Sequence, residues 1–287
     1  MNTALLLTTA AIWGFAFVAQ RAGMELIGPL TYNGVRFTLG LISLLPFFLL
    51  SRRAKPKKTI PAGRKDIILW GCLTGLMLCA ASALQQIGIV WTSAGKAGFV
   101  TGLYVVLVPL FGHFLGRRSG KAGWAGALLS IAGLYFISVE DFSINKGDLF
   151  IFASAFFFAA HVLLVAKNSS RFQPLSFALV QYALCAALSL AAALAAETWN
   201  TQAVLSAWLP IVYGGVFSIG IAYSLQIAAL KTAHPTHASV LLSTAGLFAA
   251  AGGVLILSES FSPRELFGAG LMLCGTLVSR NSSLFRK

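Results

Sequence analysis

Inside the long apolar runs of this 287-residue chain, a few side chains could recognise a polar solute. Arg36 is the strongest candidate, because a charged group placed in lipid is costly and is usually kept for a function. Its guanidinium could attract a carboxylate or a phosphate, with Asn33 one turn away on the same helical face. The alternative is a structural role, in which Arg36 reaches the membrane surface or bonds loop carbonyls.

Neutral polar groups in other apolar runs could add to such a site. Gln85 and Gln86 are adjacent, Ser82 continues the face of Gln86 at helical spacing, and Gln226 lies in a later run. These amides could satisfy the donors and acceptors of a solute without adding charge, or they could bond each other. The imidazole of His161, in the middle of another run, could bond a solute, carry a proton or donate to a neighbouring helix.

Aromatic side chains complete the candidate set. Rings with polar atoms suit a cavity for amphipathic solutes, although plain helix packing is the alternative for each ring. The candidate solute-binding residues are Trp13, Phe17, Asn33, Arg36, Ser82, Gln85, Gln86, Thr101, Tyr104, Phe157, His161, Tyr223 and Gln226.

The chemistry of an enzyme or a pump has no obvious place in these runs. They contain no Asp or Glu, so an acidic proton relay is not expected, and the chain has no Walker A sequence for ATP. The four cysteines lie inside apolar runs without paired spacing, which indicates neither a disulfide nor a metal site. We therefore expect no catalysis, no metal and no cofactor. Three modes of transport remain: movement of the solute down its gradient, exchange, and proton coupling through His161. We favour the first two.

Ten apolar spans must position these residues. The chain is 57% hydrophobic and 10% charged, and the length of the spans matches that of helices crossing a bilayer. We predict an all-α integral membrane protein with ten transmembrane helices. The predicted spans are 3–20, 29–50, 67–90, 97–115, 122–139, 149–166, 174–195, 207–230, 238–257 and 266–280.

Positive and negative side chains occupy different gaps between the predicted spans. Most of the 21 Lys and Arg residues lie in the gaps after every second span, including Lys55, Lys57 and Lys58, whereas all acids except Asp66 lie in the other gaps. This bias predicts a multi-pass protein of the inner or plasma membrane with both termini in the cytoplasm. It also accounts for the net charge of +13, so we expect no nucleic-acid partner. The expected partners are the lipid bilayer and a small-molecule substrate, and we expect a monomer.

An internal repeat divides the chain into residues 1–145 and 146–287. At one constant offset Pro29-Leu30-Thr31 aligns with Pro174-Leu175-Ser176, and at a second offset Gln86 aligns with Gln226. Each half holds five predicted helices, an odd number, so the second half must enter the membrane from the opposite side. Two inverted five-helix repeats with a solute site between them are typical of secondary transporters.

The chain resembles the drug/metabolite transporter superfamily, in its ten-helix, two-repeat EamA-type branch. The residues that carry the resemblance are Trp13-Gly14, Pro29, Arg36-Phe37, the segment from Thr92 to Phe99, Tyr104, Pro109, Glu259, Ser262-Pro263 and Gly268. The resemblance covers essentially the whole length and implies export of a metabolite without naming it. Many relatives carry an acid in the ninth helix where this chain has Ala245, so a mechanism that uses that carboxylate is not implied.

These observations predict a secondary transporter that exports small metabolites by alternating access, as a uniporter or an exchanger. Amino acids or similar amphipathic solutes are the favoured cargo. The alternatives are a multidrug or nucleobase/nucleoside exporter of the same fold, and a passive channel.

Overall fold

The computed structural model describes residues 2–53, 63–116, 119–138, 144–257 and 262–280, and all regular secondary structure in these ranges is helical. The predicted all-α fold is confirmed. Four residues used in the sequence analysis, Lys55, Lys57, Lys58 and Glu259, lie outside the described ranges.

The helices follow the predicted spans, and several spans consist of more than one helical segment. The first half contains α1 (Asn2–Gly23), α2 (Pro29–Arg53), α3 (Arg64–Ile89), α4 (Ala94–Gly102), α5 (Tyr104–Phe114) and α6 (Lys121–Ser138). The second half contains α7 (Lys146–Asn168), α8 (Pro174–Ala196), α9 (Thr201–Ser206), α10 (Trp208–Val212), the π-helix η1 (Tyr213–Tyr223), α11 (Ser224–Ala229), α12 (Pro235–Ser243), α13 (Ala245–Leu257) and α14 (Pro263–Arg280).

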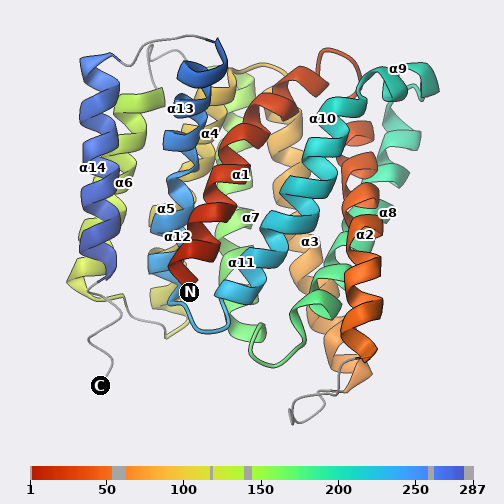
Figure 1. The fold of residues 1–287 in the computed structure, drawn as a ribbon, viewed down its shortest axis with the longest axis horizontal. Coiled ribbons are helices and arrows are strands. Elements are labelled where there is room, and N and C mark those ends of the chain that lie inside the picture. Colours follow the sequence, from red (N-terminus) through yellow and green to blue (C-terminus); the bar gives the residue numbers. More distant parts are fainter. Residues whose placement is uncertain (1, 54–62, 117–118, 139–143, 258–261, 281–287) are drawn as a thin grey trace.

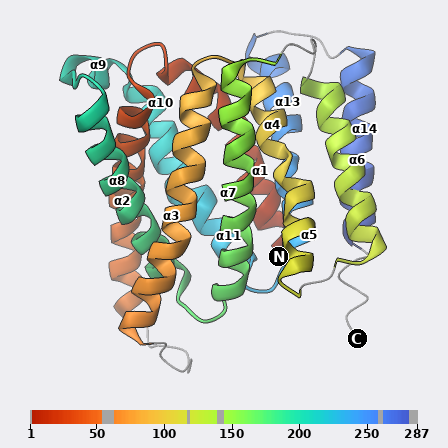
Figure 2. The ribbon, with the colours of Figure 1, turned by 180° about the vertical axis from the view of Figure 1, so that it is seen from behind.

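Seven helical stretches among the described residues are long and apolar enough to cross a bilayer. They are α1, α2, α3, α4 with α5, α7, α8, and α10 continued through η1 and α11. The remaining long helices, α6, α12 with α13, and α14, run beside them in the same bundle (Figures 1 and 2). The protein is therefore a multi-pass membrane protein.

Successive long helices run in alternating directions, so the bundle has two distinct ends (Figure 1). We call the end at which α1 begins and α14 finishes the N-terminal end, and the other the distal end. Among the described loop and helix-end residues, the N-terminal end carries cations such as Lys121, Lys167 and Arg171 with one acid, Asp66. The distal end carries charges of both signs: the cations include Lys96 and Lys146, and the acids include Glu25, Asp148, Glu197 and Glu265.

Local sequence signals set where several helices begin. Proline is the first residue of α2, α8, α12 and α14, a position at which its missing N–H costs no hydrogen bond. Asn145 and Asp148 form a reciprocal capping box at the start of α7. At the start of α2 the Glu197 carboxylate, from the end of α8, accepts hydrogen bonds from the backbone N–H groups of Leu30 and Thr31, both at 2.8 Å.

Helices from the first half of the chain pack mainly against helices from the second half. α1 packs against η1 and α13, whereas α7 packs against α3, α4 and α5. α2 contacts η1, and α8 contacts α3. α2 also packs against α8, and α6 packs against α14.

Three central helices depart from regular α geometry. Around Leu103, between α4 and α5, and around Thr244, between α12 and α13, the backbone N–H bonds the carbonyl three residues earlier and the helix tightens. In η1 the helix widens to a π-helix over 11 residues. The side chains of Thr9 and Trp13 on α1 donate to the carbonyls of Ala222 and Ser218, so these widened turns gain partners from a neighbouring helix.

Glycines permit the close approach of α1 to α13. A Cβ atom on Gly14 would lie 2.6 Å from the Ala245 carbonyl oxygen and 2.8 Å from the Ala249 nitrogen, both of which are backbone atoms. A Cβ atom on Gly270 of α14 would meet no atom within 4 Å. Gly14 is therefore required for helix contact, whereas Gly270 is not.

We predict that Gly14→Ala destabilises the protein by about 1–3 kcal/mol, because the added methyl group forces two backbones apart. Gly270→Ala adds the same methyl group without a clash and is expected to leave stability equal or slightly raised. The measurement is the apparent melting temperature of each purified variant in detergent. Equal melting temperatures for the two variants would show that the α1–α13 contact does not need glycine.

Candidate functional site

A cavity lies inside the bundle, between α1, α2, α3, α4 with α5, α7, η1 with α11, and α12 with α13. It leaves about 660 Å³ free of protein atoms, counted to its mouth. Eight of the predicted site residues line it, namely Trp13, Phe17, Arg36, Gln85, Thr101, Tyr104, Tyr223 and Gln226. The three distorted segments also border it, through Gly102, Ser218, Ser243 and Ala245 among others.

Among the residues that the structure describes, Arg36 is the only charged one that lines this cavity, and it is 3% exposed. Its Nε and Nη2 atoms donate to the Asn33 side-chain oxygen at 3.1 and 2.8 Å. The guanidinium also lies over the rings of Tyr32 and Phe37, 5.4 and 5.6 Å from their centroids. No carboxylate among the described residues comes within 4.0 Å of it, so its charge is not neutralised by a protein acid.

Asn33 and Ser82 do not line the cavity but hold Arg36 in place. The Asn33 amide nitrogen donates to Ser82 at 3.2 Å and to Ser189 on α8 at 2.9 Å, which orients its oxygen toward the guanidinium. The network connects α2, α3 and α8. Because Asn33 is neutral, it fixes the geometry of Arg36 without cancelling its charge.

Two amide oxygens at the cavity have no partner. The side-chain oxygens of Gln20 and Gln226 are buried and accept no hydrogen bond from the described residues, and both residues line the cavity. Gln85 differs, because its nitrogen donates to Thr101 at 2.9 Å. Gln86 lies behind the lining, where its nitrogen donates to the Gln20 backbone oxygen at 3.4 Å. No bond between Gln86 and Gln226 forms, so the amides are available for another partner.

Aromatic rings form much of the wall. The ring centroids of Trp13 and Tyr223 are 4.6 Å apart, and Trp13 donates its indole N–H to the Ser218 carbonyl. The hydroxyl groups of Tyr104 and Tyr223 have no hydrogen-bond partner among the described residues. The wall therefore combines flat apolar surface with free hydroxyl groups.

His161 lies outside the cavity lining and is 1% exposed. Its Nε2 atom is 2.9 Å from the Gln181 side-chain oxygen, and its ring packs edge-on against Tyr223. Since the Gln181 nitrogen donates to the Phe177 carbonyl, its oxygen accepts and His161 carries its proton on Nε2. This geometry fits the structural alternative, a histidine that ties α7 to α8. Phe157 is also outside the lining and packs against the main hydrophobic cluster.

Sequence reasoning missed part of the wall. Gln20, Phe158, Ser218 and Ser243 line the cavity but were not among the predicted residues. Gln20 follows Trp13 and Phe17 on one stripe of α1, and that spacing was the available signal. Ser218 and Ser243 gave no signal, because their place depends on the local distortion of their helices.

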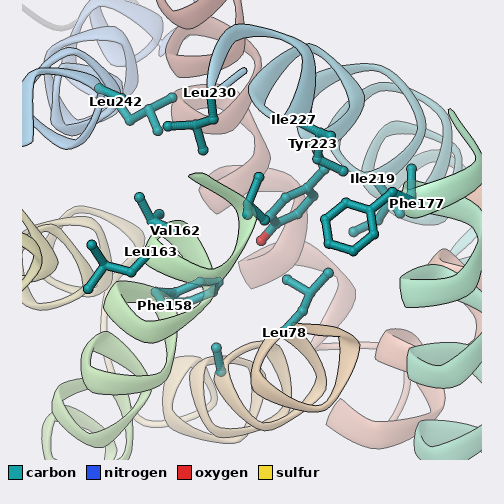
Figure 3. Close-up of a cluster of buried hydrophobic side chains, with 14 of the residues drawn as sticks. Leu78, Phe158, Val162, Leu163, Phe177, Ile219, Tyr223, Ile227, Leu230 and Leu242 are labelled. Carbon is teal, nitrogen blue, oxygen red and sulfur yellow. The ribbon is translucent and has the colours of Figure 1, made fainter. Parts of the chain in front are cut away.

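Large apolar side chains from several helices pack together in the main hydrophobic cluster (Figure 3). Leu163, Ile227, Leu230 and Leu241 come from α7, α11, the turn after α11, and α12, and none is more than 4% exposed. These four residues form what we call the leucine plug. All four belong to the main hydrophobic cluster, and their helices also carry the cavity-lining residues Val162, Gln226 and Leu242.

Comparisons with known proteins place the fold and the family. An uncharacterized transporter of Archaeoglobus fulgidus is 28% identical over 277 residues, which are 94% of this chain and 82% of that protein. An S-adenosylmethionine/S-adenosylhomocysteine transporter of Chlamydia muridarum is 27% identical over 290 residues, covering 94% and 89%. A solved crystal structure with 21% identity superposes with a TM-score of 0.79 over 99% of this chain and 97% of that one, so the overall fold is shared.

A family model covers nearly the whole chain in two separate matches. The EamA-like transporter family matches residues 2–139 and again residues 145–280. The resemblance drawn from Trp13-Gly14, Arg36-Phe37 and the other motifs is thereby confirmed. This protein belongs to the EamA-like transporter family and is a membrane transporter.

Proposed function

We propose that the protein exports small amphipathic metabolites, with amino acids as the preferred class, by alternating access as a uniporter or an exchanger. One observation carries the choice of solute. A buried, unneutralised Arg36 and the unpartnered oxygens of Gln20 and Gln226 line the same cavity. A zwitterion supplies what each group lacks, a carboxylate for the guanidinium and an ammonium for the amide oxygens.

Ten transmembrane helices in two inverted repeats are the architecture that we propose for this transport. The two matches to one family model support equivalent halves. The two tightened segments, at Leu103 and Thr244, lie at nearly equivalent positions under the second repeat offset, and both border the cavity. Interrupted helices that meet at a central site are a recurrent feature of inverted-repeat transporters.

We propose further that both termini are in the cytoplasm of a cell with the protein in its inner or plasma membrane. The support is the excess of Lys and Arg at the N-terminal end of the bundle, since cytoplasmic loops are enriched in these residues. In this proposal the leucine plug closes the cytoplasmic side. Transport then requires the plug residues on α7, α11 and α12 to separate and the distal end to close.

The aromatic wall supports a second candidate solute, a nucleoside-like metabolite. Trp13, Tyr104 and Tyr223 offer flat surfaces and hydroxyl groups that suit a purine as well as an apolar amino-acid side chain. The relative named as an S-adenosylmethionine/S-adenosylhomocysteine transporter favours this candidate, because those solutes combine an amino-acid group with a nucleoside. A solute of this kind that carries an amino-acid group would use the same carboxylate contact to Arg36.

The orientation can be tested with alkaline phosphatase, which is active only outside the cytoplasm. We predict an inactive enzyme when it is fused after Lys287 and an active enzyme when it is fused after Asn200, at the distal end between α8 and α9. The opposite pair of activities would reverse the proposed topology.

Transport can be tested with purified protein in liposomes and a panel of radiolabelled amino acids and S-adenosylmethionine. We predict saturable uptake of at least one of them, and acceleration by the same unlabelled solute inside the liposomes if the protein is an exchanger. N-acetylation of the solute should weaken uptake, because it removes the ammonium that Gln20 and Gln226 would accept. Uptake that rises linearly with concentration would instead indicate a channel.

In the same assay we predict that Arg36→Gln reduces the apparent affinity for the transported amino acid about 10- to 100-fold. This is the loss expected for a charge-assisted hydrogen bond of about 1.5–3 kcal/mol. The variant should no longer distinguish the amino acid from the corresponding amine without a carboxylate. Lys146→Gln, which removes a cation next to Trp91 outside the cavity, serves as the matched control. Unchanged discrimination in Arg36→Gln would remove the carboxylate contact from the proposal.

A further inference from the structure

A second hollow lies between α5 and α7, away from the solute cavity and near the N-terminal end. Figure 2 shows these two helices side by side. The hollow measures about 1050 Å³ and opens to the surroundings. We call it the α5–α7 groove, and its wall is formed by Phe111, Phe114, Leu115, Ala160, Leu163, Leu164 and Lys167.

The groove faces the apolar surroundings of the bundle. Phe114 is 78% exposed and Leu115 is 67% exposed, values that are costly in water and ordinary in lipid. Ala160 makes the hollow because its side chain is small, whereas one turn away Phe156 packs on Phe111 with ring centroids 6.1 Å apart. That ring pair closes the groove toward the middle of the bundle. From Lys167 to Ala160 the groove extends along about 10 Å of helix.

Two cations lie near the Trp70 ring, and one of them, Lys167, also borders the groove. The Lys167 ammonium lies 5.0 Å from the centroid of the Trp70 ring, and the Arg171 guanidinium lies 6.0 Å from the same ring. Arg171 also donates to the neutral side chain of Asn168 at 3.3 Å. Among the described residues no carboxylate comes within 4.0 Å of either cation. Because both cations lie at the same indole, an anionic group beside Trp70 would be attracted by both charges.

We propose that the α5–α7 groove binds an anionic phospholipid from the leaflet at the N-terminal end of the bundle. An acyl chain lies against Phe114, Leu115 and Ala160, and the phosphate is bound by Lys167 and Arg171. The apolar wall alone would accept any lipid, whereas the paired cations select a net negative headgroup. Basic residues at the cytoplasmic surface attract anionic lipid with about 1 kcal/mol each.

The test is native mass spectrometry of the purified protein with phosphatidylglycerol or phosphatidylcholine of identical acyl chains. We expect wild type to bind phosphatidylglycerol more tightly than phosphatidylcholine. Lys167→Gln should weaken phosphatidylglycerol binding about fivefold, the factor that corresponds to about 1 kcal/mol, and leave phosphatidylcholine binding unchanged. Lys167→Gln combined with Arg171→Gln should abolish the preference.

Two further variants separate this site from general attraction to a basic surface. Lys121→Gln removes an exposed cation from the same end of the bundle, at the start of α6, and should leave the preference intact. Ala160→Phe fills the groove and should weaken the binding of both lipids. The proposal is overturned if Lys167→Gln binds phosphatidylglycerol as wild type does, if Lys121→Gln weakens it equally, or if Ala160→Phe has no effect.

Discussion

The constraint on which the structure depends is that backbone N–H and C=O groups in a bilayer must find partners within the protein. Long helices meet this requirement along their length, and their ends need separate solutions. Proline begins four helices, Asn145 and Asp148 cap α7, and Glu197 accepts from the first N–H groups of α2. The Glu197 contact also joins α8 to α2, so a helix cap becomes a tertiary link between the two halves.

The same constraint explains why irregular backbone is found around the cavity. The widened turns of η1 are tolerated because Thr9 and Trp13 on α1 donate hydrogen bonds to its carbonyls. The same helix also packs closely against α13, which it can do because residue 14 is glycine. Small residues of the distorted segments, Gly102, Ser218 and Ser243, line the cavity. Stability and solute access therefore depend on the same few contacts of α1.

Charged side chains have different partners at three places in the molecule. At the distal end Lys96 and Asp148 form an ion pair at 2.6 Å, which is a satisfied contact between α4 and α7. In the cavity Arg36 is oriented by Asn33 but keeps its net charge, which favours an anionic group from a solute. At the α5–α7 groove Lys167 shares the Trp70 ring with Arg171 without an acid, which favours a lipid phosphate.

The sequence by itself determined the all-α fold, the approximate positions of the long helices and the inventory of polar groups, because a bilayer restricts local composition. Trp13, Arg36 and Gln226 could be named for the cavity on that basis. The sequence did not determine that Ser218 and Ser243 would join them or that His161 would bond Gln181. Helices that are apolar on every side carry no periodicity that fixes their rotation. That rotation is set by contacts such as Gly14 with Ala245, which exist only once the helices are packed.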